Sequence, residues 1–376
     1  EDSTEVLTGL TLTNGYTTIT GGGGIRIENS SPRLKNLKIL NSVANVGGGG
    51  ISCEACDSRI TDVVIANNSV TGIGGGMRMF NGSNPELLGV TVSNNTSTLN
   101  GGGIAYEGLP ASTIEQRLHR VTVSGNRSSE GVGGGIYLYS SIATVTRSFI
   151  QDNAASLKGG CLSIEWASEL RLENSFVSGN ALTNGVQGSN VYIGKSDQLI
   201  GSNEKLIAMN SNLIDTVALS DENLFSMYTN GLVKPLLINS IAIGRLDAAI
   251  PTSNFDLNYS YCNDCSNLLT FAANTGNITG SAGFVDFDKG KFDLADNSLL
   301  LSAATESFTT VANETYRAPE VDIRGTQRPI PFGSKLDIGA YESEFSGKSL
   351  AATGITDGLS INNEIDYSNI TSTLSA

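Results

Sequence analysis

The chain has 376 residues, of which 44 are glycine and only 16% are charged, and its formal net charge is -14. This acidity argues against nucleic acid as a partner, because phosphates would repel the chain. Apolar runs stay shorter than the roughly 18 residues of a membrane-spanning helix, so we expect no membrane insertion. The chain starts at Glu1 within the first repeat and shows no signal peptide, so we expect a monomeric segment of a longer protein.

A sequence motif repeats about every 27 residues as far as Gly194. Each copy has a glycine run, short apolar stretches and a closing residue. The closing residues are Gly15, Ser42, Asn68, Asn95, Asn126, Asn153 and Asn180. A constant period of this length is typical of solenoids, whose units bury their apolar faces against each other. We therefore predict regular coils over residues 1–194.

The alternation inside each copy predicts strands. The first stretch reads apolar, polar, apolar at residues 25–27, 51–53, 77–79, 104–106, 136–138, 162–164 and 191–193. A second stretch has apolar pairs at Leu37 and Ile39, Val63 and Ile65, Val90 and Val92, and Val121 and Val123. A third, shorter stretch has one apolar residue per copy, at Leu34, Ile60, Leu87, Leu118, Val145 and Leu172. Three short strands per coil, separated by Gly, Asn and Ser turns, predict an all-β fold, a right-handed parallel β-helix.

The turn residues suit this fold. Glycine runs such as 22–24 and 101–103 permit positive φ and close backbone approach at tight corners. Asn at five successive closing positions predicts a ladder of side chains that hydrogen-bond along the solenoid and satisfy buried turn backbone. Asn also tolerates the left-handed backbone region expected at such a turn.

Five cysteines indicate the compartment. Cys53 and Cys56, and Cys262 and Cys265, are spaced as CxxC pairs that lie far apart in the chain, and no histidine flanks them. Local disulfides in an exported solenoid are therefore favoured over a zinc site. Cys161 stands where other copies have their last glycine, so we expect it to be a buried, unpaired thiol.

The repeat loses its regularity after Gly194. Residues 195–345 are predicted to form irregular coils and a C-terminal cap, with strands at 206–213, 236–243 and 268–271, because an open β-helix leaves an unpaired edge. Residues 346–376 have the composition of a tail or linker. They contain a degenerate calcium-loop pattern, which is the one hint of a cofactor or metal, and its residues are Asp357, Gly358, Asn362, Asn363, Glu364 and Asp366.

Two sets of motifs carry a family resemblance. The sequence VSNN at 92–95 ahead of GGGI at 101–104 resembles the paired GGA(I/L/V) and FxxN motifs of bacterial polymorphic outer-membrane adhesins. The C-terminal sequences resemble the terminal module of secreted β-helix proteins with variable anchors, and they are GNITG at 276–280, FVD at 284–286, FDL at 292–294, DIRG at 322–325, RP at 328–329 and DIGAYE at 337–342. The resemblance implies an extracellular or cell-surface bacterial protein. It does not choose between adhesins and carbohydrate-active enzymes.

Function is expected on outward columns, because one surface position recurs on every coil. One column contains Glu28, Glu54, Phe80, Glu107, Tyr139 and Glu165 with Trp166, beside Arg26, Arg78, Tyr137 and Tyr192. The other contains Arg33, Arg59, Glu86, Arg117, Thr144 and Arg171. We expect the columns to face each other across a turn, either as ion pairs (Glu28 with Arg33, Glu54 with Arg59, Glu165 with Arg171) or as a glycan groove.

The groove interpretation makes specific residues candidates for ligand binding. They are Arg26, Arg78, Glu107, Arg117, Tyr137, Tyr139, Trp166, Arg171 and Tyr192. Aromatic rings would stack on sugars, and the arginines would favour acidic sugars on an extracellular glycan or a neighbouring cell surface. The leading functional prediction is therefore a secreted or surface-displayed adhesin or polysaccharide-binding β-helix. A structural stalk is a second possibility.

An enzyme that cleaves an acidic glycan, either a polysaccharide lyase or a glycoside hydrolase, is the main alternative. The copy between Gly103 and Asn126 carries an insertion and the densest set of acid and base groups, namely Tyr106, Glu107, Glu115, Arg117, His119 and Arg120. Glu107, Arg117 and His119 are the catalytic candidates. Against this, a single histidine on a loop is usually a solvated side chain, and adjacent coils carry no cluster of aspartates.

Overall fold

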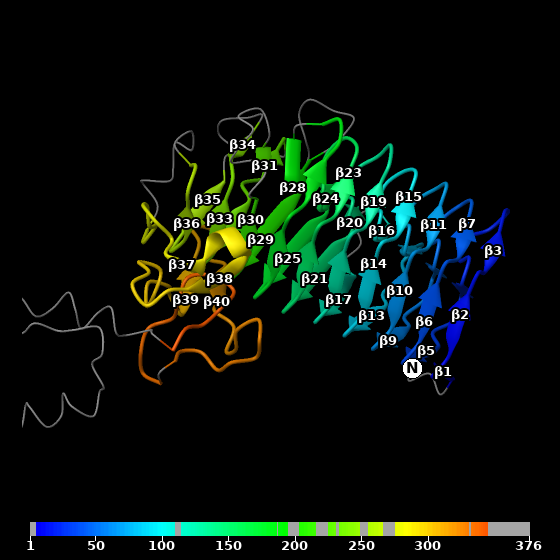
Figure 1. The fold of residues 1–376 in the computed structure, drawn as a ribbon, viewed down its shortest axis with the longest axis horizontal. Coiled ribbons are helices and arrows are strands. Elements are labelled where there is room, and N and C mark those ends of the chain that lie inside the picture. The colour runs from blue at the N-terminus through cyan, green and yellow to red at the C-terminus, as the bar shows by residue number, and fades with distance from the viewer. Residues whose placement is uncertain are drawn as a thin grey trace, which may run out of the picture.

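The structure is a computed structural model that describes residues 5–109, 114–185, 187–194, 203–215, 225–230, 233–248, 255–265, 275–330 and 332–344. These residues wind into a stack of coils, which Figure 1 shows from the side. The strand predicted at 268–271 and the tail predicted at 346–376, with its calcium-type pattern, lie outside the described residues.

Four parallel sheets run along the stack, and we name them A to D in the order in which each coil visits them. Sheet A contains β1 (Val6–Thr8), β5 (Arg33–Lys35), β9 (Arg59–Thr61), β13 (Glu86–Leu88), β17 (Glu115–His119), β21 (Ile142–Thr146), β25 (Glu169–Glu173), β29 (Lys205–Met209), β32 (Leu236–Ile238) and β35 (Asp256–Asn258). Sheet B contains β2 (Thr11–Thr13), β6 (Lys38–Leu40), β10 (Val64–Ala66), β14 (Thr91–Ser93), β18 (Thr122–Ser124), β22 (Phe149–Gln151), β26 (Phe176–Ser178), β30 (Asn212–Ile214), β33 (Ile241–Ile243) and β36 (Tyr261–Cys262). Sheet C contains β3 (Tyr16–Thr17), β7 (Val43–Ala44), β11 (Ser69–Val70), β15 (Thr96–Ser97), β19 (Arg127–Ser128), β23 (Ala154–Ala155) and β27 (Ala181–Leu182). Sheet D contains β4 (Ile25–Glu28), β8 (Ile51–Glu54), β12 (Met77–Phe80), β16 (Ile104–Glu107), β20 (Ile136–Tyr139), β24 (Leu162–Glu165), β28 (Gln187–Ile193), β31 (Phe225–Thr229) and β34 (Leu246–Ala248).

Each strand pairs in parallel with the equivalent strand of the next coil. Ile65 of β10, for example, lies between Ile39 of β6 and Val92 of β14. The predicted all-β parallel β-helix with about 27 residues per coil is confirmed. The sequence predicted three strands per coil and missed sheet C, because its strands have only two residues and show no alternation.

Equivalent apolar side chains stack inside the coils and form one continuous core. Leu34, Ile60 and Leu87 of sheet A are at most 2% exposed, as the inward pattern predicted. Tyr106 also points inward and is 1% exposed, and burial raises its pKa far above the ordinary tyrosine value. Its place in a surface group of acids and bases was therefore predicted wrongly.

The predicted Asn ladder is confirmed. The backbone N–H groups of Asn68, Asn95, Asn126 and Asn153 each donate to the side-chain Oδ1 of the next ladder residue at 2.9–3.0 Å. The side-chain amides donate along the same column at 2.9–3.2 Å. The left-handed backbone lies one residue earlier than the ladder, at positions such as Asn67 (φ 57°) and Asn94 (φ 55°).

A second ladder, made of serines, lies at the turn between sheets A and B. The N–H groups of Ser175, Ser211 and Ser240 donate to the hydroxyls of Ser211, Ser240 and Ser260 at 3.1–3.2 Å. Sheets A and B continue past Gly194, where the repeated glycine runs end, and the serine ladder continues with them. The sequence missed the ladder because serine is common in every turn of this chain.

The glycine corners and the cysteines agree with their predicted roles. A Cβ on Gly102 would collide with the backbone of the next coil at Arg127 and Gly134, so this corner admits only glycine. Cys161 takes the last-glycine position in its coil and is a buried free thiol. Disulfides join Cys53 to Cys56 and Cys262 to Cys265, whose Cα atoms are 5.8 and 5.9 Å apart.

The C-terminal module, residues 275–344, folds back along the side of the solenoid (Figure 1, yellow and orange). It contains β37 (Phe284–Asp286), the 3₁₀ helix η2 (Phe287–Lys289), β38 (Lys291–Leu294), β39 (Ser307–Thr309) and β40 (Thr315–Arg317). Phe292 packs on Phe176 of sheet B with ring centroids 5.2 Å apart, and Phe308 and Tyr316 pack on the outer face of sheet A. The sequence had predicted a cap on the open end and did not predict this lateral contact.

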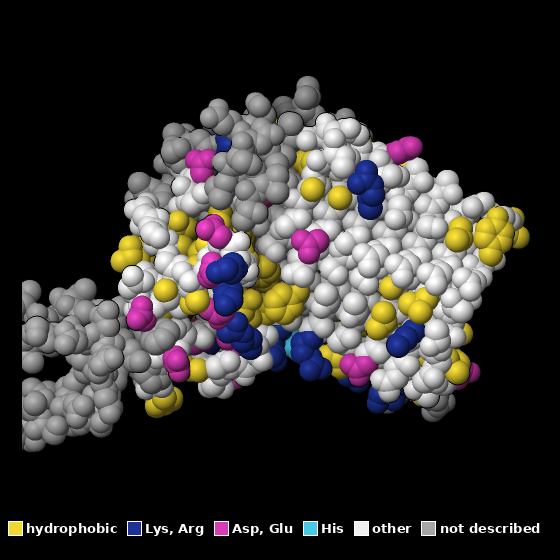
Figure 2. All heavy atoms as spheres, viewed as in Figure 1, with side chains coloured by type: hydrophobic (Ala, Val, Ile, Leu, Met, Phe, Trp, Pro, Cys, Tyr) yellow, Lys and Arg dark blue, Asp and Glu magenta, His cyan; other side chains and the backbone are white. Residues whose placement is uncertain are grey.

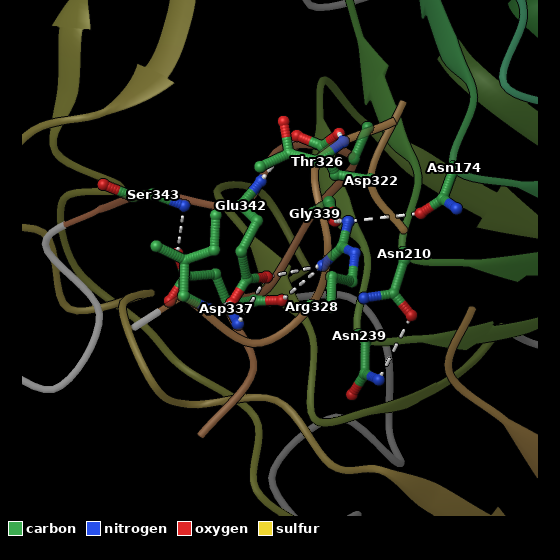
Figure 3. Close-up of polar contacts among 12 residues, drawn as sticks. Asn174, Asn210, Asn239, Asp322, Thr326, Arg328, Asp337, Gly339, Glu342 and Ser343 are labelled. Atoms are coloured by element: carbon green, nitrogen blue, oxygen red, sulfur yellow. Dashed lines mark hydrogen bonds and ion pairs between the residues drawn. The ribbon is translucent and has the colours of Figure 1, made fainter. Parts of the chain in front are cut away.

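The C-terminal motifs form a buried polar network that fastens this module (Figure 3). Arg328 is buried, and its Nη1 donates to Glu342 Oε2 at 2.9 Å. Its Nη2 donates to Asn174 Oδ1 in the solenoid at 3.1 Å. Burial and the nearby Asp337 raise the pKa of Glu342 to about 7.

Backbone groups satisfy the other carboxylates of this network. Asp337 accepts the N–H groups of Ser302 and Ser343 at 2.7 and 2.8 Å. Asp322 accepts the N–H of Thr326 at 2.7 Å. The buried acidic residues Asp322, Asp337 and Glu342 therefore have a structural role.

Candidate ligand-binding surfaces

The outer face of sheet D, which we call the sheet D face, carries two outward columns set by the strand register. The first column contains Arg26, Ser52, Arg78, Ala105, Tyr137, Ser163, Tyr192 and Tyr228. The second contains Glu28, Glu54, Phe80, Glu107, Tyr139 and Glu165. Seven of the nine residues predicted to bind a ligand therefore lie on or beside this face, and they are Arg26, Arg78, Glu107, Tyr137, Tyr139, Trp166 and Tyr192.

The N-terminal half of the sheet D face is charged. Arg26 pairs with Glu28 at 2.9 Å and lies 3.8 Å from Glu54. Arg78 pairs with Glu107, and its guanidinium lies 4.3 Å from the centre of the Phe80 ring. Both arginines therefore already have carboxylate partners on their own sheet.

The C-terminal half of the face is aromatic. The rings of Tyr139 and Trp166 have centroids 5.3 Å apart, and both side chains are partly exposed. Tyr137 lies next to Tyr139, with centroids 6.4 Å apart, but only 5% of it is exposed. The Tyr139–Trp166 pair is thus the accessible aromatic surface among these three residues.

Tyr192 is also covered, although it belongs to an outward column. It stacks on Tyr228 with centroids 6.2 Å apart and planes 5° apart. The Nζ of Lys158 lies over the Tyr192 ring, 4.6 Å from its centre, and Tyr192 is fully buried. Desolvation raises the pKa of Tyr137 and of Tyr192 above the ordinary tyrosine range. Neither hydroxyl is placed to meet a ligand directly.

The remaining predicted binding residues, Arg117 and Arg171, lie on the outer face of sheet A, which we call the sheet A face. Arg117 lies 3.8 Å from Glu115, and Arg171 pairs with Glu169 at 2.8 Å. Arg59 of the same face pairs with Glu86 at 3.1 Å.

These ion pairs join neighbours within one sheet instead of crossing the turn. Arg59 pairs with Glu86 and not with its predicted partner Glu54. Arg171 pairs with Glu169 and not with its predicted partner Glu165. Glu165 is 1% exposed and accepts a hydrogen bond from Ser163 at 2.9 Å. The two columns lie on different sheets, so the structure supports two separate surfaces in place of one groove.

The catalytic candidates are divided in the same way. Glu107 is on the sheet D face with Arg78, whereas Arg117 and His119 are on β17 of sheet A. His119 lies in a strand and not on the predicted loop, and its Nδ1 is 2.7 Å from Thr146 Oγ1. Desolvation, followed by the charges of Arg120 and Arg147, lowers its pKa. Residues 110–113 of the inserted segment are outside the described part of the chain.

Among the residues that the structure describes, no group of three or more His, Cys, Asp or Glu side chains is arranged to hold a metal ion. No helix in this part of the chain has the length and apolar character needed to cross a membrane.

The sequence was also compared with known proteins. Residues 7–206 match the family described as "Right handed beta helix region". Comparisons with curated proteins and with solved structures gave no significant match. The matched segment covers more than half of the 376 residues and includes most strands of all four sheets. The chain therefore belongs to the family of right-handed β-helix proteins.

Proposed function

We propose that this chain is an extracellular, non-catalytic segment that binds a glycan on the sheet D face and serves in adhesion. The observation that carries the proposal is the partly exposed Tyr139–Trp166 pair, whose ring centroids are 5.3 Å apart. A sugar ring has an apolar C–H face and a rim of hydroxyl groups. Two neighbouring aromatic rings offer a flat apolar surface for the former, and tyrosine and tryptophan also offer polar edges.

Polar groups stand beside this aromatic pair. Glu107 is the direct neighbour of Tyr139 on the adjacent strand, and it is paired with Arg78. A carboxylate and a guanidinium side by side provide both acceptors and donors for sugar hydroxyls. The sheet D face therefore combines a stacking surface with hydrogen-bonding groups over adjacent coils.

The charges of this face favour a neutral glycan over an acidic one. Three glutamates with exposed or partly exposed side chains (Glu28, Glu54 and Glu107) stand in one column, against Arg26 and Arg78 in the other. Both arginines are paired with carboxylates. The acidic preference expected from Arg117 and Arg171 does not apply here, because those residues lie on sheet A.

The extracellular location rests on the two local disulfides, since such bonds persist in oxidising compartments. The enzyme alternative has weaker support, because Glu107, Arg117 and His119 come from two different sheets. Acid–base catalysis requires groups that reach the same substrate atoms.

Affinity electrophoresis in gels containing soluble neutral glycans, such as xyloglucan, galactomannan or mixed-linkage glucan, tests the proposal. Tyr139→Ala and Trp166→Ala should each weaken binding about fivefold, the effect of losing roughly 1 kcal/mol of stacking. Tyr16→Ala is the matched control, because Tyr16 is 70% exposed on sheet C. Equal mobility of the parent and all three variants in every gel would refute glycan binding on this face. A structural stalk would then be the favoured function. Release of new reducing ends or unsaturated products would instead indicate an enzyme.

A further inference from the structure

A shallow hollow on the sheet A face is not used by the proposed function. It has a volume of about 280 Å³ and is lined by side chains of four successive strands, β1, β5, β9 and β13. Its cationic lining residues are Arg33, Lys35 and Arg59. Val6, which is 53% exposed, and Leu88 add apolar surface.

The position of the cations follows from the strand register. The strand of Arg33 pairs with the strand of Arg59 in a register that places these two residues in the same outward column. Val6 precedes them in this column, opposite Arg33, and Glu86 follows, opposite Arg59. Neighbouring strands are about 4.8 Å apart, and like charges directly opposite each other destabilise a sheet. The carboxylate of Glu86, 3.1 Å from Arg59, offsets part of this repulsion. A bound anion would offset more of it.

The hollow is unusual for this chain. The protein has a formal net charge of -14, yet this lining contains three cations and no acidic residue. Figure 2 shows the broad, mostly uncharged face of the solenoid, with Lys and Arg side chains along its lower edge and a few acidic side chains among them. Charge complementarity therefore selects an anionic ligand.

The same column continues along the solenoid. Arg117 lies two strands beyond Arg59, and Arg171 lies two strands beyond Arg117. Each step of two strands is about 10 Å long, because neighbouring strands are about 4.8 Å apart. Glu115 and Glu169 neighbour these two arginines as Glu86 neighbours Arg59, and Lys35 is a further cation at the hollow. A row of this kind suits a polymer with repeated anionic groups more than a single small anion.

We propose that the hollow lined by Arg33, Lys35 and Arg59 binds the carboxylate or sulfate groups of an anionic polysaccharide lying along the sheet A face. Arginine presents a planar fork of donors that matches either group, and Lys35 adds a third donor. Val6 and Leu88 contact the apolar side of the sugar. This site is independent of the sheet D face, and the two differ in the charge of the glycan that they take.

The test uses the double variant Arg33→Gln/Arg59→Gln. Dissociation constants are measured by calorimetry with polygalacturonate, which carries carboxylates, and with dextran sulfate, at low and high salt. The variant should bind at least one of these polymers about tenfold more weakly at low salt, and the difference should shrink as salt screens the charges. Which polymer responds identifies the anionic group.

The matched control is Arg127→Gln/Arg317→Gln, which removes the same charge at exposed positions outside the hollow. Unchanged binding by the Arg33/Arg59 variant, or an equal loss in the control, would overturn the proposal. Melting temperatures of both variants confirm folding. Retention on neutral glycans should not change in either variant, so failure here is separable from failure of the sheet D proposal.

Discussion

The Asn ladder leads to a prediction whose size can be worked out from its hydrogen bonds. The Oδ1 of Asn126 accepts the backbone N–H and the side-chain Nδ2 of Asn95, both at 2.9 Å. Its Nδ2 donates to the Val92 carbonyl at 2.9 Å and to Asn153 Oδ1 at 3.0 Å. All these groups are buried, so Asn126→Ala admits no water to replace the lost partners without opening the coil.

The expected cost is the sum of two effects. The Asn95 N–H loses its acceptor in the interior, which costs about 1–3 kcal/mol. The two bonds that Nδ2 donated, and the one that Oδ1 accepted from the Asn95 Nδ2, are worth about 1 kcal/mol each. We therefore expect Asn126→Ala to destabilise the protein by roughly 4–6 kcal/mol, a large part of the stability of a typical domain.

Two measurements check this prediction. Denaturant unfolding compares Asn126→Ala with Asn45→Ala, an exposed control expected to change stability by less than about 0.5 kcal/mol. Hydrogen exchange followed by NMR should show faster exchange of the Asn95 amide. If Asn126→Ala matched the control in stability and the Asn95 amide kept its protection, the ladder would not be a stabilising element.

Two further predictions concern the thiols and the C-terminal module. Protein produced in an oxidising compartment should contain one thiol that reacts with an alkylating agent after denaturation without reductant, that of Cys161, and intact mass showing three or more would contradict the disulfides. The docked module should be held less firmly as pH rises. Burial raises the pKa of Glu342 to about 7 from an ordinary value near 4.5, so docking favours its protonated form, and this contribution is complete below about pH 4.5 and lost above about 7. Limited proteolysis of the module at pH 6 and pH 8 should show this difference in the parent and not in Glu342→Gln, and equal cleavage of the parent at both pH values would contradict it.

Much of the fold was predictable because one pattern recurs on each coil. Inward positions such as Ile60 and Val92 alternate with polar neighbours, and alternation of period two directly identifies the buried face of a strand. The Asn ladder was predictable for the same reason. Sheet C was not, because a two-residue strand cannot show a period.

The candidate site was predicted less well, because sequence gives the direction of a side chain but not what covers it. Tyr137 and Tyr192 do point outward from sheet D, yet neighbouring rings and side chains bury both. Arg117 and Trp166 seemed to share a groove because they belong to adjacent segments of the repeat. A turn between two sheets separates them, and its geometry is not encoded in the period.

The outward columns also explain why the C-terminal module lies where it does. On sheet A the column that carries Arg117 and Arg171 continues as Ile207 and Leu236, and the Phe308 side of the β39–β40 hairpin packs there. On sheet B the outward column likewise becomes apolar at Phe149, and this side chain packs in the apolar cluster shared with the module.

Apolar side chains on these later coils would lie exposed without the module, and exposed apolar patches on β-sheets promote association. Covering them withdraws the C-terminal parts of sheets A and B from any ligand. The sheet D face around Tyr139 and the first strands of sheet A around Arg59 stay outside the contacts of the module. A ligand that binds this solenoid through side chains of several coils therefore has these two faces available, one with an accessible aromatic pair and one with an excess of positive charge.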